Sequence, residues 1–82
     1  MENLKPKSEV LEIAKQYGYS SLFALKSSED IAQLVDNACK LRDFSGMTLA
    51  LGLVQNRMAV DIADTEYRLQ ELRQQLEDLK KS

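Results

Sequence analysis

Histidine and tryptophan are absent from this chain, and it holds only one cysteine, Cys39. Without histidine, the chain lacks the commonest general base and the commonest protein ligand of metal ions. A lone cysteine cannot form an internal disulfide, and without histidine it is no ordinary thiol nucleophile. The glycines are isolated, so there is no glycine-rich phosphate-binding loop. The sequence therefore predicts a protein that is not an enzyme, with no catalytic residue, no cofactor and no metal site.

Long apolar runs and basic clusters are also missing. No run of about 18 apolar residues occurs, which predicts that no helix spans a membrane. The first residues, MENLKPKSEV, lack the apolar stretch of a signal peptide, so we expect the protein in the cytoplasm. The net charge is −2, and neither sign accumulates along the chain. This balance argues against binding to the phosphates of nucleic acids or of an anionic membrane.

What the chain does hold is a composition typical of helices. Apolar residues make up 44% of the 82 residues, charged residues 29%, and there is a single proline. These values suit an all-α protein of one domain, at a size where a hydrophobic core is only marginally stable. Within such a fold, we expect Cys39 to be a buried apolar thiol on a helix.

Apolar periodicity and capping residues predict four helical segments, at about 8–17, 20–26, 28–43 and 46–82. Residues 1–45 then form a small N-terminal helical hairpin or bundle, and the remainder forms one long C-terminal helix. The connection between the last two segments is so short that these helices must be antiparallel neighbours.

Helix boundaries follow from a few residues with special backbone or capping roles. Gly18 is placed to end the first helix in a left-handed conformation. Ser27 or Ser28 can cap the helix that starts at about residue 28. After that helix, either Gly46 ends it or Ser45 caps the next one.

The long C-terminal helix carries two apolar stripes when its residues are placed at 100° intervals. The long stripe runs along the whole helix: Met47, Leu51, Val54, Met58, Ile62, Thr65, Leu69, Leu72, Leu76 and Leu79. The short stripe lies nearly opposite: Leu49, Leu53, Val60 and Tyr67. The first half of the helix is thus apolar on two faces and the second half on one. We expect the short stripe to pack against the N-terminal helices and the long stripe against another chain.

The long stripe therefore predicts a partner-binding surface, formed by Leu51, Val54, Met58, Ile62, Leu69, Leu72, Leu76 and Leu79. Between Leu51 and Ile62 its spacing contains an eleven-residue stutter, and about two regular heptads follow. The alternative is a monomer in which the stripe folds back on the first helix. That helix spans only about 15 Å and cannot reach Leu79.

These patterns predict a small helical protein–protein interaction module, acting as an adaptor, a co-chaperone or an inhibitor. Its long helix would form a short coiled coil with another protein chain, in a homodimer or a hetero-coiled coil. Charged residues of both signs flank the leucines, which permits self-pairing without requiring it: Arg68, Glu71, Arg73, Glu77 and Asp78.

An alternative function comes from the stretch IAKQYGYSS, from Ile13 to Ser21, which has the layout of a helix–turn–helix corner. Small Ala14 would let a second helix approach, and Gly18 would make the turn. This stretch is similar to the corresponding one in AraC-type regulators. The resemblance implies a DNA-binding transcriptional regulator with a C-terminal dimerisation helix.

The segment that would read DNA in that alternative is poor in the necessary side chains. Residues 20–30 hold Lys26 as their only basic residue and no arginine, asparagine or glutamine for base edges. Leu22, Phe23 and Leu25 are expected in the core instead.

Overall fold

The computed structural model describes residues 3–81. Within that range it contains three α-helices and no strand: α1 (Ser8–Lys15), α2 (Ser28–Leu41) and α3 (Phe44–Lys81). The predicted all-α class and the long C-terminal helix are confirmed. No helix of this range is apolar over a sufficient length to cross a membrane.

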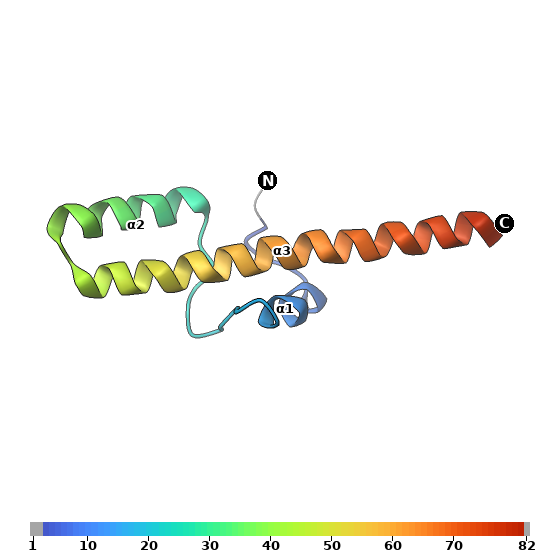
Figure 1. Cartoon of the computed structure of the whole chain (residues 1–82), viewed down its shortest axis with the longest axis horizontal. Helices are drawn as coiled ribbons and strands as arrows, with labels where there is room; N and C mark the ends of the chain where they lie inside the picture. Colours follow the sequence, from blue (N-terminus) through green and yellow to red (C-terminus); the bar gives the residue numbers. More distant parts are fainter. Residues whose placement is uncertain (1–2, 82) are drawn as a thin grey trace.

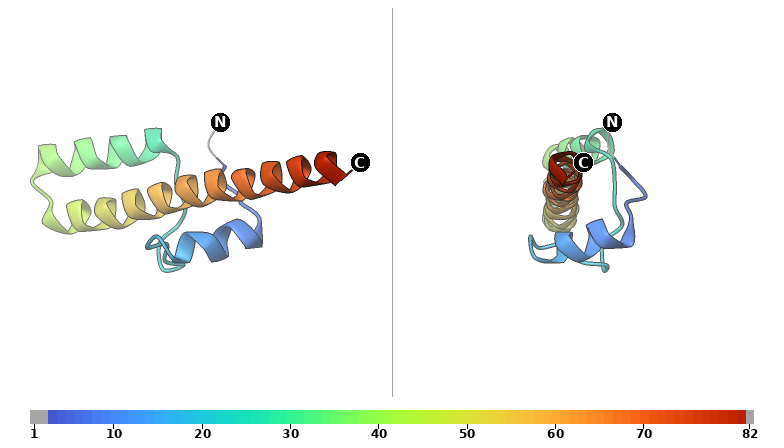
Figure 2. Two further views of the ribbon diagram at one scale, coloured as in Figure 1. Left: turned by 45° about the vertical axis from the view of Figure 1, so that its right-hand side comes forward. Right: turned by 90° about the vertical axis from the view of Figure 1, so that its right-hand side faces the viewer.

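α3 is the axis of the molecule. Its 38 residues extend for about 57 Å, and the molecule measures 61 × 21 × 16 Å along its principal axes. α2 runs antiparallel along the first half of α3, while α1 lies against another side of it near the middle (Figures 1 and 2). Both short helices pack against α3, and in the described part of the chain they do not contact each other. The second half of α3 extends beyond both (Figure 1).

A cluster of small and β-branched side chains holds α1 against α3. The buried members of this core are Val10, Ala14, Ala59, Val60 and Ala63. Alanine at three of these positions lets the two helix backbones approach closely, because little side-chain volume lies between them. Leu11, Ile13, Tyr19, Leu25 and Tyr67 pack around the cluster and are themselves partly buried.

Two residues near helix ends take the roles predicted for them, Gly18 after α1 and Ser27 before α2. α1 ends at Lys15, two residues before the predicted limit, and Gly18 then takes a left-handed conformation with φ of 99°. At the start of α2, the Ser27 hydroxyl accepts a hydrogen bond from the Asp30 N–H at 3.2 Å. Ser27 therefore satisfies one of the N–H groups that the first turn of a helix leaves without a partner.

The corner between α2 and α3 is made by other residues than those predicted. Arg42, with φ of 51°, takes the left-handed conformation that ends α2. The Asp43 carboxylate then accepts a hydrogen bond from the Gly46 N–H at 3.0 Å, as the cap of α3. Gly46 and Ser45 both lie inside the first turn of α3, so both predicted alternatives for this boundary are wrong. The antiparallel helical hairpin itself is present (Figure 1).

The short helix predicted over 20–26 does not form. This segment is an irregular connection, and the buried side chain of Asn56 holds it against α3. The Ser20 N–H donates to Asn56 Oδ1 at 2.9 Å, and Asn56 Nδ2 donates to the carbonyls of Ser20 and Phe23 at 2.8 and 3.1 Å. A helix would need those carbonyls for its own hydrogen bonds. Leu22, which was expected in the core, is 90% exposed.

Candidate functional site

The long stripe lies open along α3. Seven of the eight predicted partner-binding residues are between 45% and 71% exposed: Leu51, Met58, Ile62, Leu69, Leu72, Leu76 and Leu79. Val54, the eighth, is half-buried beside α2. From Arg68 to Lys81 every residue is exposed. The distal half of α3 therefore presents a face of exposed leucines.

The short stripe marks the side of α3 on which the N-terminal segment packs. Leu53 and Val60 are buried, and Tyr67 is half-buried with the Lys7 ammonium 5.4 Å from its ring centre. Leu49, by contrast, is 49% exposed, so its predicted burial is wrong. α2 packs over Ala50, one position further around the helix, and leaves Leu49 at the edge of that contact.

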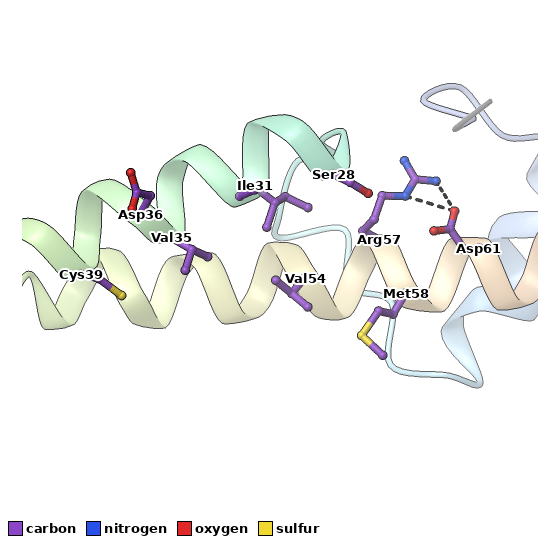
Figure 3. Close-up of a pocket in the computed structure, with 10 residues that line it drawn as sticks. Ser28, Ile31, Val35, Asp36, Cys39, Val54, Arg57, Met58 and Asp61 are labelled. Carbon is purple, nitrogen blue, oxygen red and sulfur yellow. Dashed lines mark hydrogen bonds and ion pairs between the residues drawn. The ribbon is translucent and has the colours of Figure 1, made fainter.

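Between α2 and α3 the apolar surface widens into an open groove of about 600 Å³. Figure 3 shows the side chains of both helices that line it, including Val35 of α2 and Val54 and Met58 of α3. Because Val54 and Met58 also belong to the long stripe, the groove and the stripe form one continuous apolar face.

Cys39 also lines this groove and is exposed, so its predicted burial is wrong. The physical reason is that α2 has only two buried residues, Ile31 and Ala38. Cys39 follows Ala38 directly and therefore points to the side of the contact between the helices, not into it.

A buried arginine closes one end of the groove. The side chain of Arg57 is 4% exposed, and its guanidinium donates to the Asp61 carboxylate at 2.8 and 3.2 Å (Figure 3). It also donates to the carbonyls of Asn3 and Lys26, at 3.2 and 3.5 Å. A buried guanidinium needs such partners, because an unpaired charge would be strongly destabilising there. Arg57 thereby holds the segments just before α1 and α2, at Asn3 and Lys26, against α3.

Tyr17 borders the long stripe on the side away from α2. Its O–H donates a hydrogen bond to the Glu66 carboxylate at 2.8 Å. This hydrogen bond, with partial desolvation and the negative charge of Glu66, raises the pKa of Tyr17 above its ordinary value. A shallow hollow lies between Tyr17 and three residues of the long stripe, Ile62, Thr65 and Leu69. The stripe is thus flanked by α2 and its groove on one edge and by the Tyr17–Glu66 pair on the other.

The sequence patterns did not indicate the structural roles of three residues, Asn56, Arg57 and Tyr17. One available signal was the break in the short stripe, since Asn56 and Arg57 stand between the buried Leu53 and Val60. Polar residues at such positions are buried only if they have hydrogen-bond partners. The sequence offers no comparable signal for Tyr17.

Comparison with known protein families, with curated proteins and with solved structures finds no match to this chain. Within residues 3–81, no group of three or more acidic or cysteine side chains is placed to hold a metal ion. Among the described residues, the largest exposed apolar surface is the face of α3 formed by the long stripe and the groove beside α2.

Proposed function

We propose that this protein is a small helical interaction module that associates with another protein chain through the long stripe of α3. One observation carries the proposal: Leu69, Leu72, Leu76 and Leu79 are all at least 50% exposed on a helix that extends beyond the rest of the molecule. The stripe has the spacing of a coiled-coil seam over this distal half. The module would serve as an adaptor, a co-chaperone or an inhibitor, acting in the cytoplasm.

The energetics support association. Full burial of one leucine side chain stabilises by about 1.5–3 kcal/mol. Burial of the four distal leucines is therefore comparable with the whole free energy of unfolding of a typical domain, about 5–15 kcal/mol. An isolated helical segment of this length is marginal in water. A partner helix would therefore stabilise the distal half of α3 as well as bind to it.

The DNA-binding alternative receives less support from the fold. A helix–turn–helix needs a second helix after the turn at Gly18, and residues 20–26 form an irregular connection instead. The side chain of Asn56 is hydrogen-bonded to backbone N–H and carbonyl groups of that connection. We therefore place the function on α3 and not on the corner between residues 13 and 21.

Light scattering across a concentration series, with circular dichroism alongside, tests the proposal. Replacing Leu72 and Leu76 by glutamate puts two charges into the seam, so the Leu72→Glu/Leu76→Glu chain should be monomeric where the wild-type chain is associated. The signal from α1 and α2 should persist, because neither helix contacts these residues.

A matched control places the same two charges on the opposite side of the helix. Gln70→Glu/Gln74→Glu has the same spacing and the same added charge, and both positions are exposed and face away from the stripe. It should associate like the wild-type chain. A leucine variant with the same mass as an associated wild-type chain would contradict the proposal. A wild-type chain that stays monomeric at every concentration would exclude only the homodimer and leave the hetero-coiled coil.

A further inference from the structure

The regular part of the long stripe has a simple coiled-coil assignment. Ile62, Leu69 and Leu76 take the first core position (a) of successive heptads, and Thr65, Leu72 and Leu79 take the second (d). Two edges flank this core. One edge, position e, holds Glu66, Arg73 and Lys80, and the other, position g, holds Asp61, Arg68 and Gln75.

A parallel, in-register pair of these helices would bring like charges together. In that arrangement each g residue faces the e residue five positions later in the second copy. Asp61 would face Glu66, Arg68 would face Arg73, and Gln75 would face Lys80. Each contact occurs twice by symmetry, so four like-charge pairs would form and no opposite-charge pair.

An antiparallel pair is electrostatically favourable in one register. When Leu69 lies opposite Leu72 of the second copy, the core layers are completed by Thr65 opposite Leu76 and Ile62 opposite Leu79. The two e edges then face each other, and Glu66 of each copy lies beside Arg73 of the other. The two g edges place Arg68 beside the uncharged Gln75.

Antiparallel registers shifted by one heptad are less favourable. A shift in one direction pairs Glu66 with Lys80 of the second copy, but it also brings Arg73 beside Arg73 and loses the two outermost core layers. A shift in the other direction brings Glu66 beside Glu66 and Arg68 beside Arg68. Only the unshifted register combines the full set of core layers from Ile62 to Leu79 with opposite charges at the edge.

The rest of the fold accommodates this register. α1 packs around Val60 and Ala63. Tyr17, which follows α1, borders the long stripe beside Ile62, Thr65 and Leu69 but leaves these three residues exposed. α2 begins at Ser28, close to Arg57, and runs back toward the start of α3. A second helix that covers Ile62 to Leu79 would therefore lie beyond the end of α2. It would leave the groove between α2 and α3 open.

From this charge pattern we propose that the occupant of the distal stripe is a second copy of this chain, paired antiparallel with the two-fold axis between Gln70 and Glu71. The inference rests on the proposed function, since it specifies the partner and the orientation for the same surface. It places the two α1–α2 bodies at opposite ends of a rod and gives each end one open groove.

Disulfide trapping tests the orientation. In a Cys39→Ser background, a chain with Thr65→Cys is mixed with a chain with Leu76→Cys, equilibrated and then oxidised. The antiparallel register predicts mixed disulfides between the two variants, resolved by mass spectrometry. Leu76→Cys alone should not cross-link, because the two copies of residue 76 would be about 16 Å apart along the axis. Efficient cross-linking of Leu76→Cys to itself would overturn the proposal in favour of a parallel pair.

Charge exchange gives a second, independent readout. Glu66→Arg or Arg73→Glu alone should raise the dissociation constant roughly tenfold in the antiparallel pair, since two attractive contacts become repulsive. The Glu66→Arg/Arg73→Glu chain should recover the wild-type value. In a parallel pair both single variants should instead tighten association, because each removes like-charge contacts. Tyr17→Phe is the matched control, as it removes the Glu66 hydrogen bond within the chain and leaves the charge.

The two proposals fail in different ways. A wild-type chain that light scattering finds monomeric throughout overturns this inference alone, because it excludes a second copy and leaves a different chain as the partner in the proposed function. A dimer that Leu72→Glu/Leu76→Glu dissociates, but that cross-links as a parallel pair, supports the proposed function and overturns only the antiparallel assignment.

Discussion

Gly52 shows how a missing side chain shapes the fold. A Cβ atom at this position would lie 2.5 Å from the ring of Phe23, so the glycine lets that ring rest directly on the backbone of α3. In a free helix, alanine would stabilise by about 1 kcal/mol relative to glycine. Here we expect Gly52→Ala to lower the free energy of unfolding by about 1–2 kcal/mol, because the displaced ring outweighs that gain. Urea denaturation measures the difference.

The control for this prediction is a double-mutant cycle with Phe23→Ala. Once the ring is gone, Gly52→Ala should stabilise the chain by about the propensity difference, so the sign of its effect should reverse. If Gly52→Ala stabilises the chain in both backgrounds, the ring does not require the glycine.

The hydrogen bond between Tyr17 and Glu66 leads to a prediction about pH. The raised pKa of Tyr17 means that the hydrogen bond favours the neutral hydroxyl. Its contribution to stability is therefore fully present below the ordinary tyrosine pKa of about 10, and it is lost as the pH rises through the higher folded value. Glu66→Gln should move the Tyr17 ionisation to lower pH, which the absorbance of ionised tyrosine reports when the titration of the Tyr17→Phe chain is subtracted. An unchanged titration curve would show that Glu66 does not control this hydroxyl.

Residue by residue, the exposed apolar positions were easier to predict than the buried polar ones. The exposure of the distal leucines follows from periodicity alone, because their neighbours at other angles on the helix are charged or amide-bearing. The roles of Asn56 and Arg57 depend on the carbonyls of Asn3, Ser20, Phe23 and Lys26, which approach α3 only in the folded chain. No local pattern encodes such contacts.

Local sequence signals predicted the helices α1, α2 and α3. They failed at the segments whose conformation depends on tertiary contacts. Gly18 and Ser27 act where the sequence placed them, since Gly18 turns the chain in a left-handed conformation after α1 and Ser27 caps α2. The α2–α3 corner instead uses Arg42 in a left-handed conformation that few non-glycine residues adopt. The helix expected at 20–26 is replaced by hydrogen bonds to Asn56.

The two faces of α3 should respond differently to the same substitution. Val60 is fully buried under α1, so Val60→Asp puts an unpaired carboxylate into the core and should unfold the base. Ile62 is 45% exposed on the long stripe, so Ile62→Asp should leave the base folded and weaken association. Thermal melting by circular dichroism and light scattering separate the outcomes. A well-folded Val60→Asp chain would show that α1 does not depend on this face.

For the whole molecule, the two-stripe pattern correctly divided α3 into a packed half and an exposed half. It could not show that α1 and α2 occupy different sides of α3, because short helices with one apolar face each have many possible arrangements. The groove was also unpredictable, since it exists only because α2 contacts α3 through a narrow strip at Ile31 and Ala38. The exposed surface is therefore larger than the stripe alone.

The rate of amide hydrogen exchange should distinguish the packed half of α3 from its exposed distal half. In a monomer, the amides from Gln70 to Leu79 belong to a stretch of α3 whose residues are all exposed, and such segments open at little cost in free energy. We expect their exchange to slow markedly as protein concentration rises, because the partner buries the stripe. Amides from Val54 to Val60, under the α1 and α2 contacts, should exchange slowly at every concentration. In the Leu72→Glu/Leu76→Glu chain the distal amides should stay fast throughout. If the amides from Gln70 to Leu79 exchange slowly at every protein concentration, the distal half of α3 is protected by its own chain. That result would contradict the exposure of these residues in the structure.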